Sequence, residues 1–175
     1  MKILSIQTKK LSPDKINKII NLKATHYKFK KKLQLLWFNN NIKKTDIHNI
    51  LIHNNEIIGY NCLRKIKLLK VVSKKKKTIN SILFDTLIIN EKYRKKNLSK
   101  FIMKRSNLII KKKNIFSFLV CSRSMTKYYK KFNWKLFPKN KIKFSKNNDF
   151  IGKRCMIFKD NIKNFAEAKY EILNH

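Results

Sequence analysis

The chain has 175 residues, of which 43% are hydrophobic and 11% aromatic. This size and composition suit one globular domain with a full core and are inconsistent with disorder. The formal charge of +35, from 44 basic and 9 acidic residues, attracts nucleic acid, acidic proteins and phosphorylated cofactors, and it repels polyamines, cationic antibiotics and basic protein tails. The charge therefore favours an anionic or neutral substrate over a cationic one.

The lysine excess has two explanations. All but five of the basic residues are lysine, isoleucine and asparagine are also frequent, and the chain has only two glycines and two prolines. An AT-rich genome would produce this composition. Selection for a surface that binds nucleic acid, the ribosome or another anionic partner would produce the lysines as well. Both explanations stay open at this stage.

The cysteines and the apolar segments bear on the cellular compartment that we expect for the protein. Cys62, Cys121 and Cys155 are odd in number, widely spaced and set in apolar runs, so we expect reduced core thiols rather than a disulfide framework or a metal site. No segment approaches the roughly 20 apolar residues that a membrane span requires, and the residues after Lys2 are too short for a signal peptide. We expect a cytoplasmic protein, monomeric or homodimeric, that binds no membrane.

The first 45 residues predict one strand and two helices. Residues 1–8 alternate as a strand does, and Ser12-Pro13-Asp14 then supplies a capping hydroxyl, a proline at the first helical position and an early acid. We expect this helix to end near Leu22 and residues 24–30 to form a connection. The apolar face of the second helix is predicted to contain Leu33, Leu36 and Trp37.

The middle of the chain predicts a hairpin followed by a further strand. Ile50–Ile52 and Ile57–Leu63 flank a turn at His53-Asn54-Asn55. The run Lys74–Lys77 is expected to be a solvated turn, and Ser81–Ile89 is expected to be a strand.

The last third predicts alternating helices and strands. A helix is expected to end near Lys113, a buried strand to occupy residues 115–121, and a short helix residues 125–132. Closing strands are predicted over residues 134–144 and 154–159. A last helix is predicted over residues 161–173, because Ile162, Phe165, Ala168 and Ile172 recur at helical spacing. We therefore expect one domain over residues 1–160, with residues 161–175 as its C-terminal helical extension.

One stretch of the sequence predicts a binding site for an anionic ligand. The strand end Leu87–Ile89 leads through the basic turn Arg94–Leu98 into a helix that begins near Ser99. The first amides of a helix lack partners and its dipole is positive there, so this turn is a cradle for an anion such as a phosphate. The following helix is predicted to turn one face toward the protein through Leu98, Phe101, Ile102, Arg105, Leu108 and Ile109.

This stretch resembles the acetyl-CoA-binding segment of the GNAT acyltransferase superfamily, in which a strand leads into Arg-x-x-Gly-x-Gly/Ala. Asn97 and Ser99 replace the two glycines. Asparagine tolerates a positive φ better than other non-glycine residues, and serine keeps the second position small. The resemblance covers about residues 1–160 and implies an α/β (α+β) GNAT fold: a central mixed, mostly antiparallel sheet of six to seven strands flanked by about four helices.

The resemblance also implies acetyl-CoA as the co-substrate, without a metal. The turn would bind the pyrophosphate, and the strand edge together with one serine would bind the pantetheine amides. The residues given these roles are Arg94, Lys95, Lys96, Asn97, Leu98, Ser99 and Lys100 for the pyrophosphate, and Ile88, Ile89 and Ser122 for pantetheine.

A second segment, Ser122–Trp134, resembles the GNAT segment Asn-x-x-Ala-x-x-Phe-Tyr-x-Lys-x-Gly-Phe. Tyr129 falls on the tyrosine that in many members protonates the departing CoA thiolate, and Asn133 falls on the glycine. A phenol held near the sulfur can donate that proton. The alternative is that Tyr128 and Tyr129 only pack one face of a short helix.

Further candidates concern the acceptor. Asp85 is the acid of the strand 81–89, and strand alternation predicts that it shares a face with Leu83, Leu87 and Ile89. It is either the general base for the acceptor or a polar residue at the opening of the sheet. His26 and Tyr27 fall in the region that walls the acceptor pocket in the GNAT fold, although aromatic residues there also serve as core.

Two functions follow from these observations. The first is an acetyl-CoA-dependent acyltransferase that moves the acyl group to an amine or hydroxyl by direct transfer in a ternary complex. The second is a basic nucleic-acid-binding protein on a catalytically degenerate GNAT fold, whose affinity would fall steeply with salt.

Overall fold

The structure is a computed structural model, and it describes residues 1–27, 29–144, 152–158 and 168–172. The helices in these residues are α1 (Pro13–Tyr27), α2 (Lys31–Asn41), α3 (Ser99–Lys113) and α4 (Thr126–Lys130), with short 3-10 turns that include η2 (Glu91–Tyr93) and η3 (Arg123–Met125). The strands are β1 (Lys2–Gln7), β2 (Ile47–His53), β3 (Glu56–Val72), β4 (Lys75–Ile89), β5 (Ser117–Cys121), β6 (Trp134–Leu136), β7 (Ile142–Phe144), β8 (Arg154–Phe158) and β9 (Lys169–Ile172).

The strands form a mixed sheet. They pair in the order β1-β2-β3-β4-β5-β8-β6, and β9 pairs with β3 and with β7. The recorded pairs are antiparallel except β4–β5 and β7–β9. The expected α/β class, a mostly antiparallel sheet with four helices, is confirmed. The described residues hold nine strands instead of six to seven, because the predicted strand 134–144 is divided into β6 and β7 and because β9 is added.

Two compact units share these elements. Unit 1 contains residues 1–64 and 85–106, and unit 2 contains residues 65–84 and 107–175. Both β3 and β4 pass from one unit into the other. Each unit is described by itself below.

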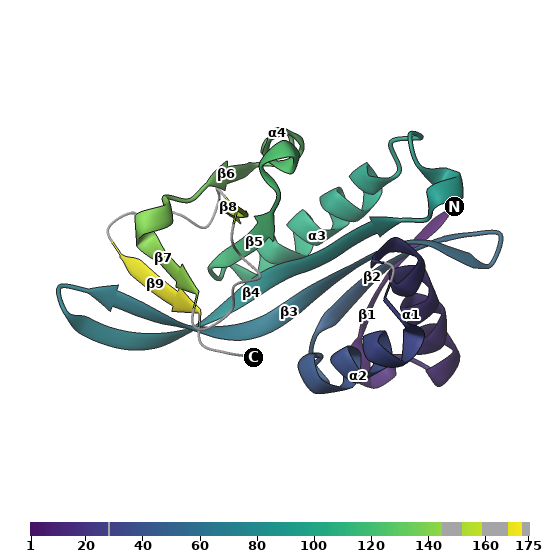
Figure 1. The fold of residues 1–175 in the computed structure, drawn as a ribbon, viewed down its shortest axis with the longest axis horizontal. Helices are drawn as coiled ribbons and strands as arrows, with labels where there is room; N and C mark the ends of the chain where they lie inside the picture. Colours follow the sequence, from purple (N-terminus) through teal and green to yellow (C-terminus); the bar gives the residue numbers. More distant parts are fainter. Residues whose placement is uncertain (28, 145–151, 159–167, 173–175) are drawn as a thin grey trace. The chain divides into compact units, whose positions relative to one another are not determined.

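Unit 1 is a sheet with a helical layer on each face. Ile19 and Leu22 of α1 pack with Tyr60 and Cys62 of β3, and α1 and α2 lie side by side on that face (Figure 1). The opposite face is covered by the start of α3, where Ile102 packs on Leu51 and Ile58. The predicted hairpin is confirmed: Asn54 and Asn55 have φ of 45° and 60°, the left-handed pair that a two-residue turn needs.

Helix α1 is longer than predicted. It continues through residues 24–27 to Tyr27, where a connection was expected. Lys23 is buried with Leu22, and the Thr25 hydroxyl donates to the Leu22 carbonyl at 2.9 Å. The burial of Lys23 therefore accompanies a helix that continues beyond Leu22, the last residue of its apolar repeat.

The buried faces of α2 and α3 also differ from the predicted ones. Leu33 and Leu36 are 54% and 56% exposed, whereas Gln34 and Phe38 are buried, and Phe38 stacks on His48. On α3 the buried positions are Ile102, Met103, Ser106 and Ile110, and Phe101 and Leu108 are exposed. Polar Gln34 and Ser106 occupy buried positions, so a pattern of apolar residues alone places each face incorrectly.

Unit 2 has an aromatic core. Phe116, Phe118 and Phe137 pack with Tyr170, whose ring stacks on Phe116 with centroids 4.6 Å apart. Parallel pairing joins Ile82–Phe84 of β4 to Ser117–Leu119 of β5.

Two predictions for unit 2 are corrected. Residues 169–172 of the predicted C-terminal helix are strand β9, because Ala168 and Tyr170 alternate into the core and the strand pairs with Leu68–Val71; residues 161–167 and 173–175 lie outside the described part. The lysine run is only partly a turn, because Ser73 and Lys74 form it and Lys75–Lys77 begin β4.

Candidate functional site

The basic turn after β4 has the backbone that the sequence predicts for an anion cradle. Asn97 has φ of 57°, as expected for a residue that replaces a glycine, and Lys95 has φ of 62°. Helix α3 begins at Ser99. Within the described residues, no acceptor is recorded for the amides of Asn97 and Leu98. Donors of this kind at the positive end of a helix suit an anionic ligand.

The side chain of Arg94 is fixed beside this turn. Its Nε donates to the Ile89 carbonyl at 3.2 Å, and its Nη2 donates to His26 Nδ1 at 2.9 Å. Burial first, and the Arg94 charge second, lower the pKa of His26, which keeps the imidazole neutral and able to accept this bond. The structure thus brings together Arg94, a predicted cofactor residue, and His26, a predicted substrate residue.

The lysines of the turn remain available to a ligand. Lys95 and Lys96 are exposed and Lys100 is partly exposed. The Lys96 ammonium lies 5.9 Å from the Tyr93 ring centroid and that of Lys100 lies 5.3 Å from the Phe101 ring centroid. Contacts at these distances are weak, about 0.5–1 kcal/mol for exposed pairs, so they leave the charges free to meet phosphate oxygens.

The predicted pantetheine residues differ in accessibility. Ile88 is 1% exposed and packs with Ile50 and Tyr60 on one face of the sheet. Ile89 packs with Ile58 and Ile102 on the other face. Any contact with a ligand would therefore use backbone groups, and the Ile89 carbonyl already accepts from Arg94.

Strand β4 is interrupted next to Asp85. Thr86 has φ of 58°, which breaks the alternation of the strand. The Asp85 carboxylate consequently meets Arg64, whereas Leu87 and Ile89 pack in the cluster that contains Ile102. The prediction that Asp85 shares a face with Leu87 and Ile89 is therefore wrong, since a period of two cannot include this bulge.

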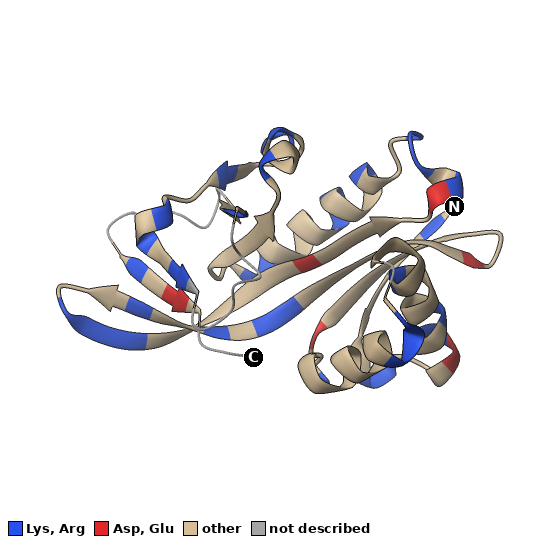
Figure 2. Ribbon diagram, viewed as in Figure 1, with Lys and Arg blue, Asp and Glu red and all other residues tan. Residues whose placement is uncertain are grey.

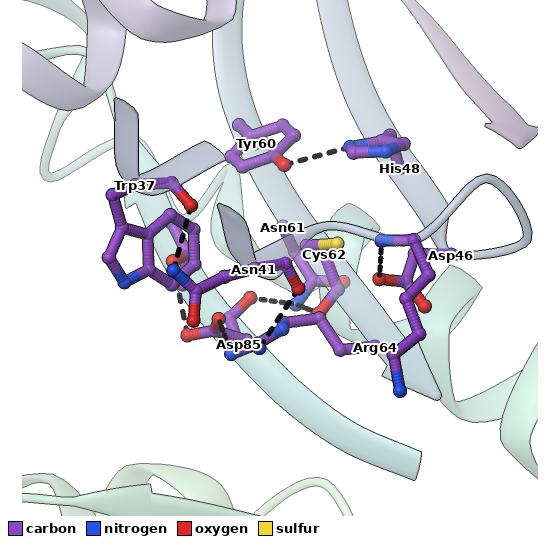
Figure 3. A network of polar contacts seen from close by, with 11 residues as sticks. Trp37, Asn41, Asp46, His48, Tyr60, Asn61, Cys62, Arg64 and Asp85 are labelled. Carbon is purple, nitrogen blue, oxygen red and sulfur yellow. Dashed lines mark hydrogen bonds and ion pairs between the residues drawn. The ribbon is translucent and has the colours of Figure 1, made fainter. Parts of the chain in front are cut away.

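Asp85 belongs to a polar network, shown in Figure 3. Arg64 Nη1 donates to Asp85 Oδ2 at 3.3 Å, and Arg64 Nη2 donates to the Asn41 carbonyl at 3.0 Å. The Thr86 hydroxyl donates to Asp85 Oδ1 at 3.2 Å. Tyr27 bonds Thr86, and the pKa of Tyr27 is raised by burial. Both oxygens of the carboxylate are therefore held, and the predicted residues Tyr27 and Asp85 are linked through Thr86.

Two cations approach one aromatic ring in this network. The Lys23 ammonium lies 3.8 Å from the Trp37 ring centroid and the Arg64 guanidinium carbon lies 5.2 Å from it. Lys23 is 3% exposed and Arg64 is 7% exposed. Burial lowers the pKa of Lys23, while the charge of Asp85 raises it.

Three further groups of the network (Figure 3), His48, Tyr60 and Cys62, are buried and neutral. His48 is fully buried, with Nε2 2.8 Å from the Thr8 hydroxyl and Nδ1 2.8 Å from the Tyr60 hydroxyl. Burial lowers the pKa of His48 to about 4. Burial also raises the pKa of Tyr60 and of the Cys62 thiol far above their ordinary values. These groups are uncharged at neutral pH, so they contribute buried hydrogen bonds to the network and no charge.

Unit 2 contains the two remaining predicted residues. Tyr129 is 8% exposed in α4, and its ring meets Phe84 and Tyr128 edge to face. Ser122 precedes η3, and its hydroxyl lies 2.8 Å from that of Ser124. Asn133 has φ of 67°, as expected for a residue that replaces the family glycine. Much of Tyr129 is thus packed, so its proposed chemistry depends on its hydroxyl alone.

Two cavities in unit 1 lie apart from the predicted residues. One, of about 420 Å³, is lined by residues of α1, the β2–β3 turn and Asn90. The other, of about 380 Å³, lies between α1 and α2 and includes Lys31, Lys32 and Leu35. Neither is lined by His26 or Tyr27.

The described residues contain no group of three or more His, Cys, Asp or Glu side chains placed to hold a metal ion. Cys62, Cys121 and Cys155 are all buried and unbridged, as predicted. In the described part of the chain, no helix has the length and apolar character needed to cross a membrane.

Lys23, Arg64 and Thr86 are not among the functional residues predicted from the sequence. Arg64 had a usable signal, because it is one of five arginines among 44 basic residues and arginine is preferred where a buried fork of donors is needed. Lys23 and Thr86 had none, since their roles depend on contacts with Trp37 and Tyr27.

Comparisons with known proteins bear on the fold. No protein-family model matches the sequence, and no curated protein matches it. An acyl-CoA N-acyltransferase from Pseudomonas aeruginosa has a TM-score of 0.66 and 10% identity, over 90% of this chain and 99% of that chain. The GNAT family N-acetyltransferase YhbS from Escherichia coli, in complex with CoA, has a TM-score of 0.62 and 12% identity, over 99% and 91%. Tetrahymena GCN5 has a TM-score of 0.60 and 14% identity, over 90% and 96%.

Proposed function

The chain has the GNAT acyltransferase fold, and from this premise we propose that it transfers an acetyl or other acyl group from acyl-CoA to an amine or hydroxyl acceptor. The observation that carries the proposal is the cradle after β4. Asn97 adopts the left-handed backbone that a glycine supplies in the family motif, and the turn it forms ends at a helix start. Two structures of this fold, from Escherichia coli and Thermoplasma acidophilum, are complexes with CoA.

In the proposed reaction the acceptor attacks the thioester carbonyl carbon within a ternary complex, and the carbon–sulfur bond breaks. Arg94, Lys95, Lys96 and Lys100, with the amides of residues 95–99, would bind the pyrophosphate. Backbone groups of Ile88 and Ile89 and the Ser122 hydroxyl would bind pantetheine. The CoA thiolate would take its proton from Tyr129.

Asp85 has two proposed roles that experiment can separate. As a general base it would take the acceptor's proton, directly or through water. As a polar anchor it would only hold Arg64, and the two hydrogen bonds already made by its oxygens support this second role.

Calorimetry with acetyl-CoA tests the proposal at one position. Asn97→Gly should bind acetyl-CoA at least as tightly as the natural chain, because glycine adopts φ of 57° without strain. Asn97→Val should bind about five- to thirtyfold more weakly, because a β-branched residue loses roughly 1–2 kcal/mol in this conformation. Absence of acetyl-CoA binding by the natural chain would refute the proposal.

A second candidate function, nucleic-acid binding, is favoured by the charge of unit 2. Its sequence has 24 basic and 4 acidic residues, and Figure 2 shows lysines and arginines along the β3–β4 hairpin and β7. Lys74–Lys77 at the hairpin are all exposed.

Binding of a single-stranded RNA at several salt concentrations tests this second function. The slope of log affinity against log salt should be steep, and replacing Lys74–Lys77 by glutamine should reduce it by about 3, at roughly 0.7 per phosphate contact. Replacing Lys111–Lys113 at the end of α3 is the control for net charge. An unchanged slope in the hairpin variant would show that the hairpin lysines do not contact the RNA.

A further inference from the structure

Three charged groups meet at the Trp37 ring, the cations Lys23 and Arg64 and the carboxylate Asp85. Lys23 and Arg64 are both almost fully buried, and both lie over the Trp37 ring. The ring attracts a desolvated cation, but it carries no net charge and so neutralises neither. Asp85 is the carboxylate that bonds Arg64 and the one whose charge favours protonated Lys23. The three groups together carry a net charge of one positive unit.

One donor in this cluster has no acceptor among the residues that the structure describes. Arg64 uses Nη1 for Asp85 and Nη2 for the Asn41 carbonyl, as Figure 3 shows. Its Nε is buried and makes no hydrogen bond in the described residues. An unsatisfied buried donor destabilises the fold, and it does so more strongly on a charged group. A missing oxygen ligand accounts for both the orphan donor and the excess charge.

We propose that Lys23 and Arg64 bind a carboxylate group, and that this carboxylate belongs to the acceptor substrate. The acceptor assignment rests on the proposed acyl transfer, whereas the anion site does not. A carboxylate carries one negative charge, which balances the cluster, and it can accept from a guanidinium N–H and an ammonium at the same time. A phosphate dianion would leave a buried negative charge in its place. The acceptor class is therefore amines that carry a carboxylate, such as amino acids and short peptides.

The arginine side chains give a direct readout of the anion site. The chain has five arginines, so an NMR spectrum of the Nε–H groups has at most five signals, and Arg64→Lys identifies that of Arg64. Sodium acetate should shift this signal saturably at constant ionic strength, and acetamide, its neutral isostere, should not. No saturable shift, or an equal shift with acetamide, overturns the proposal without any variant at Lys23.

Lys23→Met tests the second cation. The midpoint of the acetate titration should rise at least about tenfold, because a unit charge a few ångströms from a buried anion contributes more than this factor. Lys18→Met is the matched control, since Lys18 is exposed on the same helix and pairs with Asp14. Equal midpoints in the two variants would show that net charge, not Lys23, governs the response. If inorganic phosphate saturated the shift of the Arg64 signal at a lower concentration than acetate does, the carboxylate assignment would be overturned.

Two further measurements separate this inference from the proposed function. If calorimetry shows acetyl-CoA binding but acetate does not shift the Arg64 signal, the carboxylate site is refuted and the proposed acyl transfer stands. An acetate response without acetyl-CoA binding removes acyl transfer and, with it, the acceptor assignment. In a turnover screen of amines presented as free acids and as carboxamides, the free acids should be the acetylated members, and preference for the carboxamides contradicts the acceptor class.

Discussion

The buried imidazole of His48 should make the protein sensitive to mild acid. His48 is fully buried, and burial lowers its pKa from 6.5 to about 4. Between these two values the unfolded chain binds a proton that the folded chain does not, so the free energy of unfolding falls as pH falls from about 6.5 to about 4. A difference of roughly 2.5 pKa units corresponds to about 3 kcal/mol, a large part of the stability of a typical domain.

The substitution His48→Gln removes this proton site and keeps a polar side chain between the hydroxyls of Thr8 and Tyr60. The variant is less stable than the natural chain at neutral pH because it loses the imidazole hydrogen bonds, but its stability has no contribution from protonation of residue 48. The natural chain should lose about 3 kcal/mol more than the variant between pH 6.5 and 4.

Urea unfolding followed by tryptophan fluorescence across this pH range measures both chains. His26→Gln is the comparison variant, because the pKa of His26 is lowered too but its side chain is exposed, so its effect has the same sign and a smaller size. A difference between the natural chain and His48→Gln that stays constant within about 1 kcal/mol from pH 6.5 to 4 would refute the burial argument.

The remaining predictions concern the sheet, the proposed catalytic residues and the charge cluster. Gly59→Ala should cost about 1–3 kcal/mol in urea unfolding, because a Cβ would lie 2.8 Å from the Ile89 side chain and 2.9 Å from that of Ile102. Tyr129→Phe should lower turnover about 100-fold or more with little change in acetyl-CoA affinity if its hydroxyl donates the proton; unchanged turnover would leave Tyr129 as a packing residue. Asp85→Asn should abolish the rise of the rate with pH if Asp85 is the base, and should leave the shape of that profile unchanged if it only holds Arg64. Lys23→Met should raise the free energy of unfolding by about 1 kcal/mol; a loss would indicate that the buried ammonium is a stabilising contact.

Several local features could be predicted from the residues involved. Asn54, Asn55, Asn97 and Asn133 all adopt positive φ, because asparagine tolerates that region and the neighbouring pattern requires a turn there. The element order through α4 is also set by local patterns of apolar residues and by helix starts such as Ser12-Pro13-Asp14.

Other features depend on partners distant in the chain. The bulge at Thr86 turns Asp85 toward Arg64, 21 positions away, and no short-range pattern specifies it. Strand β9 forms because its residues pair with β3, although Ile172 also fits the helical spacing of Ile162, Phe165 and Ala168. The buried face of α3 is displaced because Ser106 bonds Asn49 and Asn61, which makes a polar residue part of the interior.

The sequence by itself therefore determined the fold class and the left-handed turn at Asn97 before α3, because both arise from local conformational preferences and short spacings. The tertiary structure alone decided where the charges of Lys23, Arg64 and Asp85 meet over Trp37. These residues come from two helices and two strands, and only packing can bring such groups to one buried ring. The chain has 44 basic residues, and composition alone cannot tell which of them matter. Burial distinguishes Lys23 and Arg64 from the others.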